Sequence, residues 1–366
     1  MTESGLAPCI GQDGGVARVT LQTIADRVGV SRTTVSNAYN RPDQLGDDLR
    51  ERILAAAAEL GYRGPDLAAR SLRTGRTGTI GLVFTEDLRF VFTDPDTTHF
   101  IQGVAETTAL ARTGLTMLPV PIGFDVGESA LMAAPVDGYL VFSVAVDHPA
   151  VEVVRSRGLP TVVVDEPDLG EGSFVGIDDR AGARLAAEHL LDLGHRRFGV
   201  LLGRVRPDGR SGPVDDDRIA EATVRIVRER LAGYGDAASA VGAELHVWEA
   251  GAMDPDAARN AALDLLDQTP GITAILCFSD QLAIGAAQAC ARLGLDVPGD
   301  ISLVGFDDVP RASTWEPPLT TIRQPMVDKG RAAAELLLEQ IDGGAAPRRV
   351  ELPIELVVRA SSGPPR

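Results

Sequence analysis

Residues 19–40 read VTLQTIADRVGVSRTTVSNAYN, and this stretch predicts two short helices joined by a glycine turn. Thr20 is suited to cap the first helix, in which apolar residues recur at helical spacing. Gly29 supplies the turn, and Ser31 is suited to cap the second helix. The outer face of the second helix carries short polar side chains and a guanidinium. Such a helix–turn–helix is shaped to enter the major groove of DNA, and the alternative is an ordinary two-helix corner of a globular domain.

The surrounding charge distribution fits a small DNA-reading domain. Residues 47–60, DDLRERILAAAAEL, predict a third helix that would close the back of the first two. Residues 18–76 hold ten arginines and seven acidic residues, a charge of +3, whereas the whole chain carries −17. This asymmetry indicates a basic head on a large acidic domain and argues against non-specific coating of nucleic acid. Residues 1–17 lack periodicity and are expected to be a disordered tail.

The pattern of apolar and polar residues changes at residue 79. Short apolar runs such as TIGLVF at 79–84 and TVVVD at 161–165 alternate with helical stretches from there on. Strands separated by helices predict parallel, doubly wound α/β sheets with both faces covered. The runs form two groups, before and after residue 178, which predicts two lobes with a ligand crevice at the carboxyl ends of the strands. Residues 204–217, rich in Gly, Pro and Asp, are expected to form a mobile loop.

Several classes of function are excluded by composition. Cys9, Cys277 and Cys290 have no metal-like spacing, so neither a disulfide framework nor a metal site is predicted. The five histidines show no partner spacing for acid–base chemistry, and we predict no catalytic residue and no cofactor. No apolar segment approaches membrane-spanning length, and no basic start precedes an apolar core. We therefore expect a soluble, cytoplasmic protein with no membrane partner.

Four segments resemble the lactose-repressor (LacI) family of bacterial transcription regulators. They are TIADRVGVSRTTVSNAYN with ERILAAAAELGYRGPDLAARSL, then VGIDDRAGARLAAEHLLDLGHRRFGVLLG, AILCFSDQLAIGA, and ISLVGFDD with PPLTTIRQPMVDKGRAAAELLLEQI. Four ordered matches are far more specific than a lone motif. The resemblance implies an all-α helix–turn–helix head followed by an α/β effector domain similar to periplasmic binding proteins. It also implies a non-enzymatic homodimer whose two heads read a palindromic operator in double-stranded DNA.

The resemblance also sets the expected domain boundaries. A head at residues 18–64 is followed by a hinge helix and linker at 65–76. The effector-binding and dimerisation domain would then occupy residues 77–366. Its two lobes would meet near residue 178, and the chain would cross back after about residue 320.

Three groups of residues are assigned to DNA by this resemblance. The base-reading positions are Arg32, Thr33 and Asn37. Arginine can form two hydrogen bonds with guanine, and asparagine can do the same with adenine. Arg32 could instead bind a phosphate. The phosphate-positioning hydroxyls are Thr20, Ser31, Thr34 and Ser36, with helix capping as the alternative for the first two. In the hinge, Leu72 between Arg70 and Arg73 would wedge into the minor groove, the alternative being contact with its dimer mate.

A small-molecule effector, a sugar or sugar derivative, is expected between the lobes. The residues assigned to it are Asp165, Arg218, Met253, Ser279, Asp307 and Gln324. Asp165 and Asp307 close apolar strands, where their carboxylates would project into the crevice and bind hydroxyl groups. The alternatives are a turn or capping role for Asp307 and a solvated helix position for Arg218.

Two departures from the family bear on the ligand. Members often carry an aromatic pair after the Asp-Pro that follows the first strand, whereas Asp96 and Thr97 follow Asp94 and Pro95 here. Met253 stands where a further aromatic residue is often found, and aromatic residues make up only 4% of the chain. We therefore predict that few aromatic side chains are present in the crevice for a sugar to stack on. Beside a ligand-responsive repressor, two further interpretations stay open: a cytosolic solute-binding protein and a repressor that senses no effector.

Overall fold

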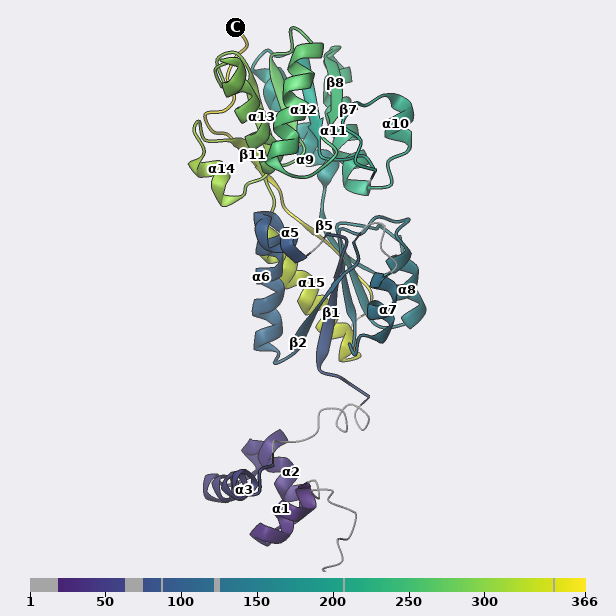
Figure 1. Cartoon of the computed structure of the whole chain (residues 1–366), viewed down its shortest axis with the longest axis vertical. Coiled ribbons are helices and arrows are strands. Elements are labelled where there is room, and N and C mark those ends of the chain that lie inside the picture. The colour runs from purple at the N-terminus through teal and green to yellow at the C-terminus, as the bar shows by residue number, and fades with distance from the viewer. Residues whose placement is uncertain (1–18, 63–74, 87, 122–125, 207, 345) are drawn as a thin grey trace, which may run out of the picture. The chain divides into compact units, whose positions relative to one another are not determined.

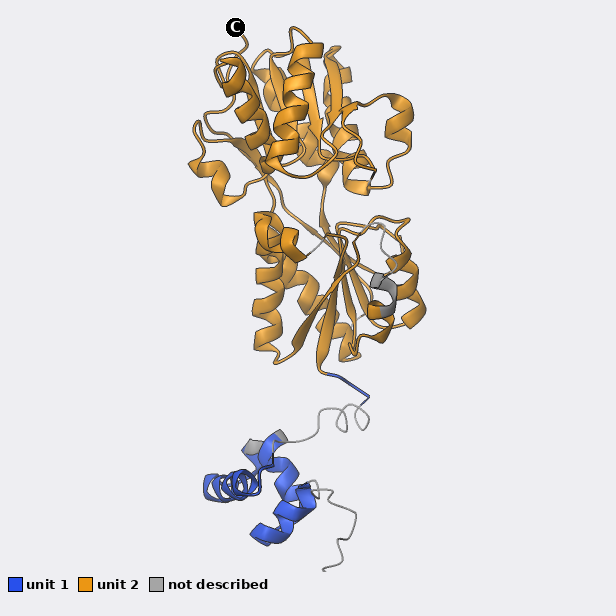
Figure 2. Cartoon of the chain, viewed as in Figure 1, with its two compact units in different colours: residues 1–77 blue, residues 78–366 orange. Residues whose placement is uncertain are grey.

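The computed structural model describes residues 19–62, 75–86, 88–121, 126–206, 208–344 and 346–366. The chain divides into two compact units, residues 1–77 and 78–366, which are coloured separately in Figure 2. The tail expected at residues 1–17 and most of the linker expected at 65–76 lie outside the described residues.

The first unit contains the helix–turn–helix. Its elements are α1 (Leu21–Val28), α2 (Arg32–Asn40), the short 3-10 helix η1 (Pro42–Gln44) and α3 (Asp47–Glu59). Thr20 and Ser31 cap α1 and α2, and Gly29 ends α1 with a φ of 77°, a backbone conformation that favours glycine. The core consists of Ile24, Ala25, Val35, Ala38, Ile53 and Ala57. The predicted helices and caps are therefore confirmed.

The second unit begins with a six-stranded parallel sheet in the order β12-β5-β4-β3-β1-β2. Figure 1 labels β1, β2 and β5 of this sheet. The strands are β1 (Thr79–Phe84), β2 (Gly114–Pro119), β3 (Tyr139–Phe142), β4 (Thr161–Val164), β5 (Ser173–Ile177) and β12 (Arg349–Leu352). The helices are α5 (Leu88–Thr93), α6 (Pro95–Leu110), α7 (Val126–Ala133), α8 (Pro149–Arg157) and α15 (Met326–Ile341). Separate buried clusters cover the two faces, one with α6 and α15 and the other with α7 and α8. This is the first lobe.

The second lobe contains a seven-stranded sheet in the order β13-β11-β10-β9-β6-β8-β7. Its strands are β6 (Arg197–Leu202), β7 (Gly212–Pro213), β8 (Glu244–Glu249), β9 (Ala274–Cys277), β10 (Ser302–Asp307), β11 (Thr320–Arg323) and β13 (Glu355–Val357). Its helices are α9 (Asp179–Asp192), α10 (Asp216–Ala220), α11 (Arg225–Val241), α12 (Pro255–Gln268), α13 (Asp280–Leu293) and α14 (Pro310–Thr314). The strands run parallel except β7 against β8 and β13 against β11.

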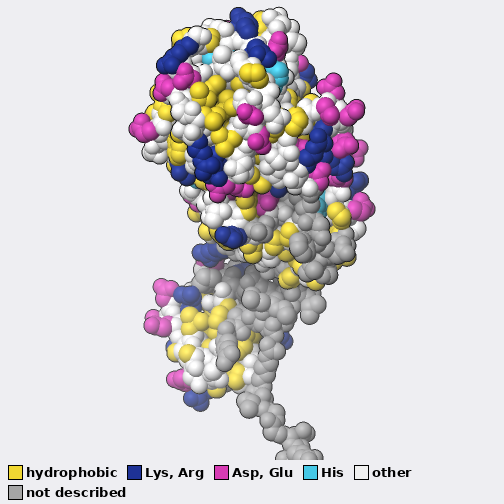
Figure 3. Space-filling view, turned by 45° about the horizontal axis from the view of Figure 1, so that its top comes forward, with side chains coloured by type: hydrophobic (Ala, Val, Ile, Leu, Met, Phe, Trp, Pro, Cys, Tyr) yellow, Lys and Arg dark blue, Asp and Glu magenta, His cyan; other side chains and the backbone are white. Residues whose placement is uncertain are grey.

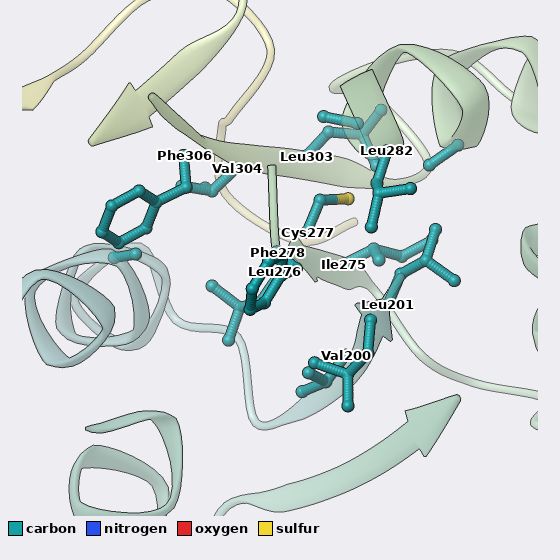
Figure 4. Packing of buried hydrophobic residues seen from close by; sticks show 14 of the residues in the cluster. Val200, Leu201, Ile275, Leu276, Cys277, Phe278, Leu282, Leu303, Val304 and Phe306 are labelled. Atoms are coloured by element: carbon teal, nitrogen blue, oxygen red, sulfur yellow. The ribbon is translucent and has the colours of Figure 1, made fainter. Parts of the chain in front are cut away.

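The core of this lobe is built from the central strands. Figure 4 shows Val200, Leu276, Cys277, Val304 and neighbouring residues packed together from β6, β9 and β10. These strands are apolar on both faces because helices cover both sides of the sheet. On the surface that Figure 3 shows, acidic and basic side chains are interspersed among apolar ones. The predicted fold class, a helical head and a two-lobed doubly wound α/β domain, is confirmed.

The chain passes between the two sheets three times. It crosses after β5, returns after β11 to form α15 and β12 in the first lobe, and crosses again to add β13 to the second sheet. The third crossing was not expected from the sequence. β13 is a three-residue strand at the edge of the sheet, antiparallel to β11, and it lacks the long apolar run that marks a central strand.

Glycines allow close helix contacts in both lobes. A Cβ added at Gly103 of α6 would lie 2.0 Å from the carbonyl oxygen of Val327, and one at Gly330 of α15 would lie 2.1 Å from that of Phe100. In the second lobe, a Cβ added at Gly233 of α11 would lie 2.2 Å from the carbonyl oxygen of Arg180. Glycine is required at these positions because any side chain would push the helices apart.

Candidate functional site

Helix α2 turns a polar face outward. Val35 and Ala38 are buried in the head, whereas Arg32 and Thr33 are exposed and Asn37 is half-buried. The three side chains assigned to base reading are therefore accessible from outside the domain. A helix with this distribution presents donors and acceptors of the kind that read base edges in a major groove.

The hydroxyls assigned to phosphates have partners inside the head. Thr20 Oγ1 accepts a hydrogen bond from the Thr23 N–H at 3.3 Å, and Ser31 Oγ accepts one from the Thr34 N–H at 3.0 Å. Ser31 Oγ also lies 2.8 Å from Thr34 Oγ1. Thr20 and Ser31 thus have a structural role as helix caps, while Thr34 and Ser36 are half-buried on the helix. The hinge assignments Arg70, Leu72 and Arg73 lie outside the described residues.

A cavity of about 510 Å³ lies between the two lobes of residues 78–366. The first lobe contributes Phe84, Phe142 and Asp165, at or directly after the carboxyl ends of β1, β3 and β4. The second lobe contributes Phe278 and Asp307 at the ends of β9 and β10. This is the position where ligands bind in open α/β sheets.

Five of the six residues assigned to the effector line this cavity: Asp165, Met253, Ser279, Asp307 and Gln324. Asp165 and Asp307 both have positive φ values, 64° and 116°. Non-glycine residues seldom adopt this conformation, and they do so mostly where the surrounding structure imposes it. The hydroxyl of Ser279 caps α13 by accepting a hydrogen bond from the Leu282 N–H at 3.3 Å, so it also has a structural role.

A buried polar chain joins the two strand-end carboxylates. Lys329 Nζ donates to Asp165 Oδ1 at 2.8 Å and to Gln324 Oε1 at 2.7 Å. Gln324 Nε2 then donates to Asp307 Oδ1 at 2.7 Å. Asp165 belongs to the first lobe and Asp307 to the second. These hydrogen bonds therefore join the two lobes at the place where the polypeptide crosses from β11 to α15. All four side chains are buried.

The sequence analysis did not single out Lys329. Its side chain is 1% exposed, although lysine is almost never fully buried unless it is paired. It is the only lysine among the 366 residues, whose other cations are arginines. Its spacing from Met326 and Ala333 places it on the buried face of α15. A single lysine on the apolar face of a helix could therefore have been predicted to be a buried, paired cation from the sequence alone.

The assignment of Arg218 to the cavity is wrong. Arg218 does not line it, because its guanidinium is bound to two carboxylates elsewhere in the second lobe. Arg218 Nε lies 2.9 Å from Glu249 Oε1, and Nη1 lies 2.7 Å from Asp208 Oδ2. Glu249 is fully buried, and the guanidinium lowers the pKa of Asp208 to about 2. Asp208 belongs to the segment predicted as a mobile loop, which also contains β7.

Arg230 is the guanidinium that lines the cavity. Its Nε lies 3.0 Å from Asp179 Oδ1, and its Nη1 lies 4.0 Å from Asp307 Oδ1. The guanidinium carbon stands 3.5 Å from the centroid of the Phe306 ring, a cation–π contact. The sequence analysis missed Arg230. Its spacing from Val227 and Tyr234, on the buried face of α11, is the signal that could have identified it.

The cavity contains more aromatic side chains than the composition of the chain predicts. Phe84, Phe90, Phe142 and Phe278 all line it. These rings were not predicted because they are separated along the chain: three stand at or directly after the ends of β1, β3 and β9, and the fourth, Phe90, lies in α5. Met253 lines the cavity as well.

Burial shifts the ionisation of several carboxyl groups in the cavity. Burial raises the pKa of Glu166 to about 7, opposed by a hydrogen bond from the Arg225 N–H. Burial also raises the pKa of Asp165, against the lowering effect of Lys329. For Asp307, burial raises the pKa well above its ordinary value, although Arg230 lowers it. These shifts identify a weakly hydrated site with several carboxyl groups.

Metal-binding clusters and membrane-spanning helices are both absent from the described residues. No group of three or more His, Cys, Asp or Glu side chains there is arranged to hold a metal ion. Among the helices that the structure describes, none is both long enough and apolar enough to cross a bilayer.

Comparisons with known proteins agree with this architecture. Residues 20–64 match the family described as bacterial regulatory proteins, lacI family, and residues 187–362 match the periplasmic binding protein-like domain. An HTH-type transcriptional regulator of Mycobacterium tuberculosis is 44% identical over 354 residues, covering 95% of this chain and 98% of the relative. A lacI-family helical head followed by a two-lobed, periplasmic binding protein-like domain is the architecture of a transcriptional regulator rather than an enzyme.

Two solved structures extend the comparison. The lac repressor dimer bound to operator and the anti-inducer ONPF has a TM-score of 0.77 and 26% identity, covering 94% of this chain and 99% of that chain. A complex of the transcriptional regulator CelR with cellobiose has a TM-score of 0.67 and 30% identity, covering 94% and 100%. The chain belongs to the LacI family of bacterial transcriptional regulators.

Proposed function

We propose that this protein is a repressor that binds a palindromic operator as a homodimer, and that a sugar or sugar derivative in the cavity changes its affinity for DNA. The observation that carries the proposal is the presence, in one chain, of an accessible polar face on α2 and a 510 Å³ cavity between two lobes. The first feature is suited to reading base edges and the second to holding a small molecule.

The DNA half of the proposal assigns roles to the head. Arg32, Thr33 and Asn37 read bases, and the hydroxyls of Thr20, Ser31, Thr34 and Ser36 position phosphates. Arg70, Leu72 and Arg73 act at the centre of the operator. Two heads related by a two-fold axis would read two half-sites of opposite orientation. The solved lac repressor, which resembles this chain, is described as a dimer bound to operator.

The ligand half assigns the cavity to the effector. Asp165 and Asp307 belong to different lobes and are linked by hydrogen bonds through Lys329 and Gln324. A ligand that contacts both carboxylates would therefore favour one arrangement of the two lobes. The changed arrangement would act on the linker at residues 65–76. Coupling energies in such systems are about 1–3 kcal/mol, a change of roughly 5–150-fold in affinity. CelR, solved with cellobiose, supports a carbohydrate as the ligand.

Two experiments test the two halves. Selection of bound sequences from a random double-stranded DNA pool by the full chain should enrich a palindrome, and Leu72→Ala should lose that discrimination. A thermal-shift screen against sugars, polyols and nucleobases should yield a ligand whose effect is lost in Asp307→Ala. Ligand at a hundred times its Kd stabilises the protein by about 2.7 kcal/mol, which is readily detected.

The outcomes also separate the other two interpretations. A solute-binding protein would bind ligand but enrich no DNA sequence. A repressor that senses no effector would enrich a palindrome and show no stabilising ligand. The proposal requires both a selected sequence and a ligand that changes its affinity.

A further inference from the structure

Carboxylates outnumber cations on the wall of the cavity. Seven of its described lining residues are Asp or Glu, and two are Arg. Both arginines already have a carboxylate partner, since Arg204 donates to Glu86 and Arg230 lies 3.0 Å from Asp179. A phosphate or carboxylate on a ligand would therefore face a wall rich in carboxyl groups whose arginines are already paired.

Five of the seven carboxylates are held by donors of the protein itself. Those donors are groups of Arg204, Lys329, Arg225, Gln324 and Thr97. The other two are Asp96 and Asp147, for which no hydrogen bond or ion pair to another described residue is found. Asp147 is exposed, whereas Asp96 is half-buried. Asp96 is therefore the carboxylate left to interact with whatever occupies the cavity.

The charges around Asp96 are mostly of its own sign. The carboxylates of Asp307, Asp94 and Asp165 act on it, and Lys329 is the cation that opposes them. Burial raises the pKa of Asp96 well above its ordinary value, and Asp307 and Asp94 raise it further. The ionised form of Asp96 is thus poorly compensated, and a cation placed in the cavity would compensate it.

A structural role in α6 does not account for these observations. Asp96 lies in the first turn of α6, where an acidic residue can be stabilised by the helix dipole. Burial and the neighbouring carboxylates outweigh any such stabilisation, since the net shift of its pKa is upward. The N-terminus of the helix is already capped by Asp94, which accepts a hydrogen bond from the Thr97 N–H at 2.9 Å.

We propose that the cavity selects a polyhydroxylated ligand that bears a protonated amine, and that Asp96 is the residue that binds the amine. This inference rests on the proposed effector cavity and specifies the chemical class of the effector. The hydroxyl groups of the ligand would bind Asp165, Asp307 and Gln324, and the phenylalanines would contact its carbon skeleton. An ammonium–carboxylate hydrogen bond is about twice as strong as a neutral one, so the charge would determine specificity.

The test uses sets of ligands that are matched in shape and differ in charge. One set is glucosamine, glucose and glucuronate, and another is tris(hydroxymethyl)aminomethane, pentaerythritol and 2,2-bis(hydroxymethyl)propionate. Binding of each compound to the full chain is measured by thermal shift and calorimetry at constant ionic strength. We expect the amine of a set to bind at least about tenfold more tightly than its neutral partner, and the anion to bind most weakly.

Two variants identify the residue responsible. Asp96→Asn should remove the preference for the amine while neutral compounds still bind, and Asp264→Asn, at an exposed position of α12, should keep the preference. Equal or tighter binding of the neutral compound by the wild type, or an unchanged preference in Asp96→Asn, would overturn the inference and leave the effector cavity standing. Absence of binding by every compound in the sets would count against the cavity as a polyol site and thus against the proposed function.

Discussion

The only lysine of the chain, Lys329, is buried 2.8 Å from the buried carboxylate of Asp165. The pair joins α15, from the C-terminal part of the chain, to the end of β4, 164 residues earlier. Lys329 also holds Gln324 and, through it, Asp307 of the second lobe. One ammonium group therefore organises the polar floor of the cavity.

Removing this ammonium group should destabilise the second unit. Lys329→Met leaves Asp165 buried without its cation, and we expect the free energy of unfolding in urea to fall by about 3–5 kcal/mol. The double variant Lys329→Met with Asp165→Asn should recover much of the loss. Arg331→Met is a control in the same helix, because the ion pairs that Arg331 forms with Asp328 and Glu106 are exposed, and it should cost less than about 1 kcal/mol. Equal losses for Lys329→Met and Arg331→Met would contradict the assignment.

The buried carboxyl group of Glu166 should make stability depend on pH. Burial raises its pKa from 4.5 to about 7, so between these values the folded protein holds a proton that the unfolded chain has released. The free energy of unfolding should therefore fall as the pH rises through this window and level off above it. Asp280, whose pKa burial also raises to about 7, adds to the same slope.

Glu166→Gln should reduce that slope and raise the stability at pH 8 relative to the wild type by about 2–3 kcal/mol at most. Urea unfolding at pH 5, 6, 7 and 8 measures the effect. Glu171→Gln, at an exposed position, should follow the wild-type profile. The lowered pKa values of His189 and His195 act on the wild-type slope in the opposite direction, so the comparison with Glu166→Gln is decisive: an unchanged slope in that variant would contradict the raised pKa of Glu166.

The guanidinium of Arg32 should contribute to sequence discrimination. If it binds a guanine, Arg32→Ala should reduce the preference for the selected operator over random DNA by about 1–3 kcal/mol. If it binds a phosphate instead, affinity should fall equally for both DNAs, and the slope of log K against log salt should decrease by about one. Titrations at several salt concentrations separate the two roles. Arg52→Ala, at an exposed position of α3, serves as the matched arginine control.

Two glycines of α11 should respond oppositely to the same substitution. A Cβ at Gly233 would lie 2.2 Å from the Arg180 carbonyl oxygen, so Gly233→Ala should force α9 and α11 apart and cost about 1–3 kcal/mol or more. Gly235 has open space at the same site, and Gly235→Ala should stabilise the helix by about 0.5–1 kcal/mol. Thermal or urea unfolding of both variants checks the prediction. Similar effects of the two substitutions would contradict the close contact.

Local signals made the head predictable from the sequence. Thr20, Ser31 and Gly29 act on residues within three or four positions, so caps and turn can be inferred from the sequence. The cavity was predictable at the ends of long apolar strands, where Asp165 and Asp307 stand. Arg230 and Lys329 were missed because their partners lie 51 and 164 residues away, and no local pattern specifies such pairs. Arg218 was misassigned because its position after a loop does not show which carboxylates bind it. In the structure these are Glu249 and Asp208.

The central claim is that occupation of the cavity changes the affinity of the head for DNA. Its most direct test is an equilibrium titration of the selected palindromic DNA with the full chain, in the absence and presence of a saturating ligand found by thermal shift. We predict a change in Kd of at least about fivefold for the wild type and none for Asp307→Ala. Identical binding curves with and without the ligand, in a protein that the same ligand stabilises, would contradict it.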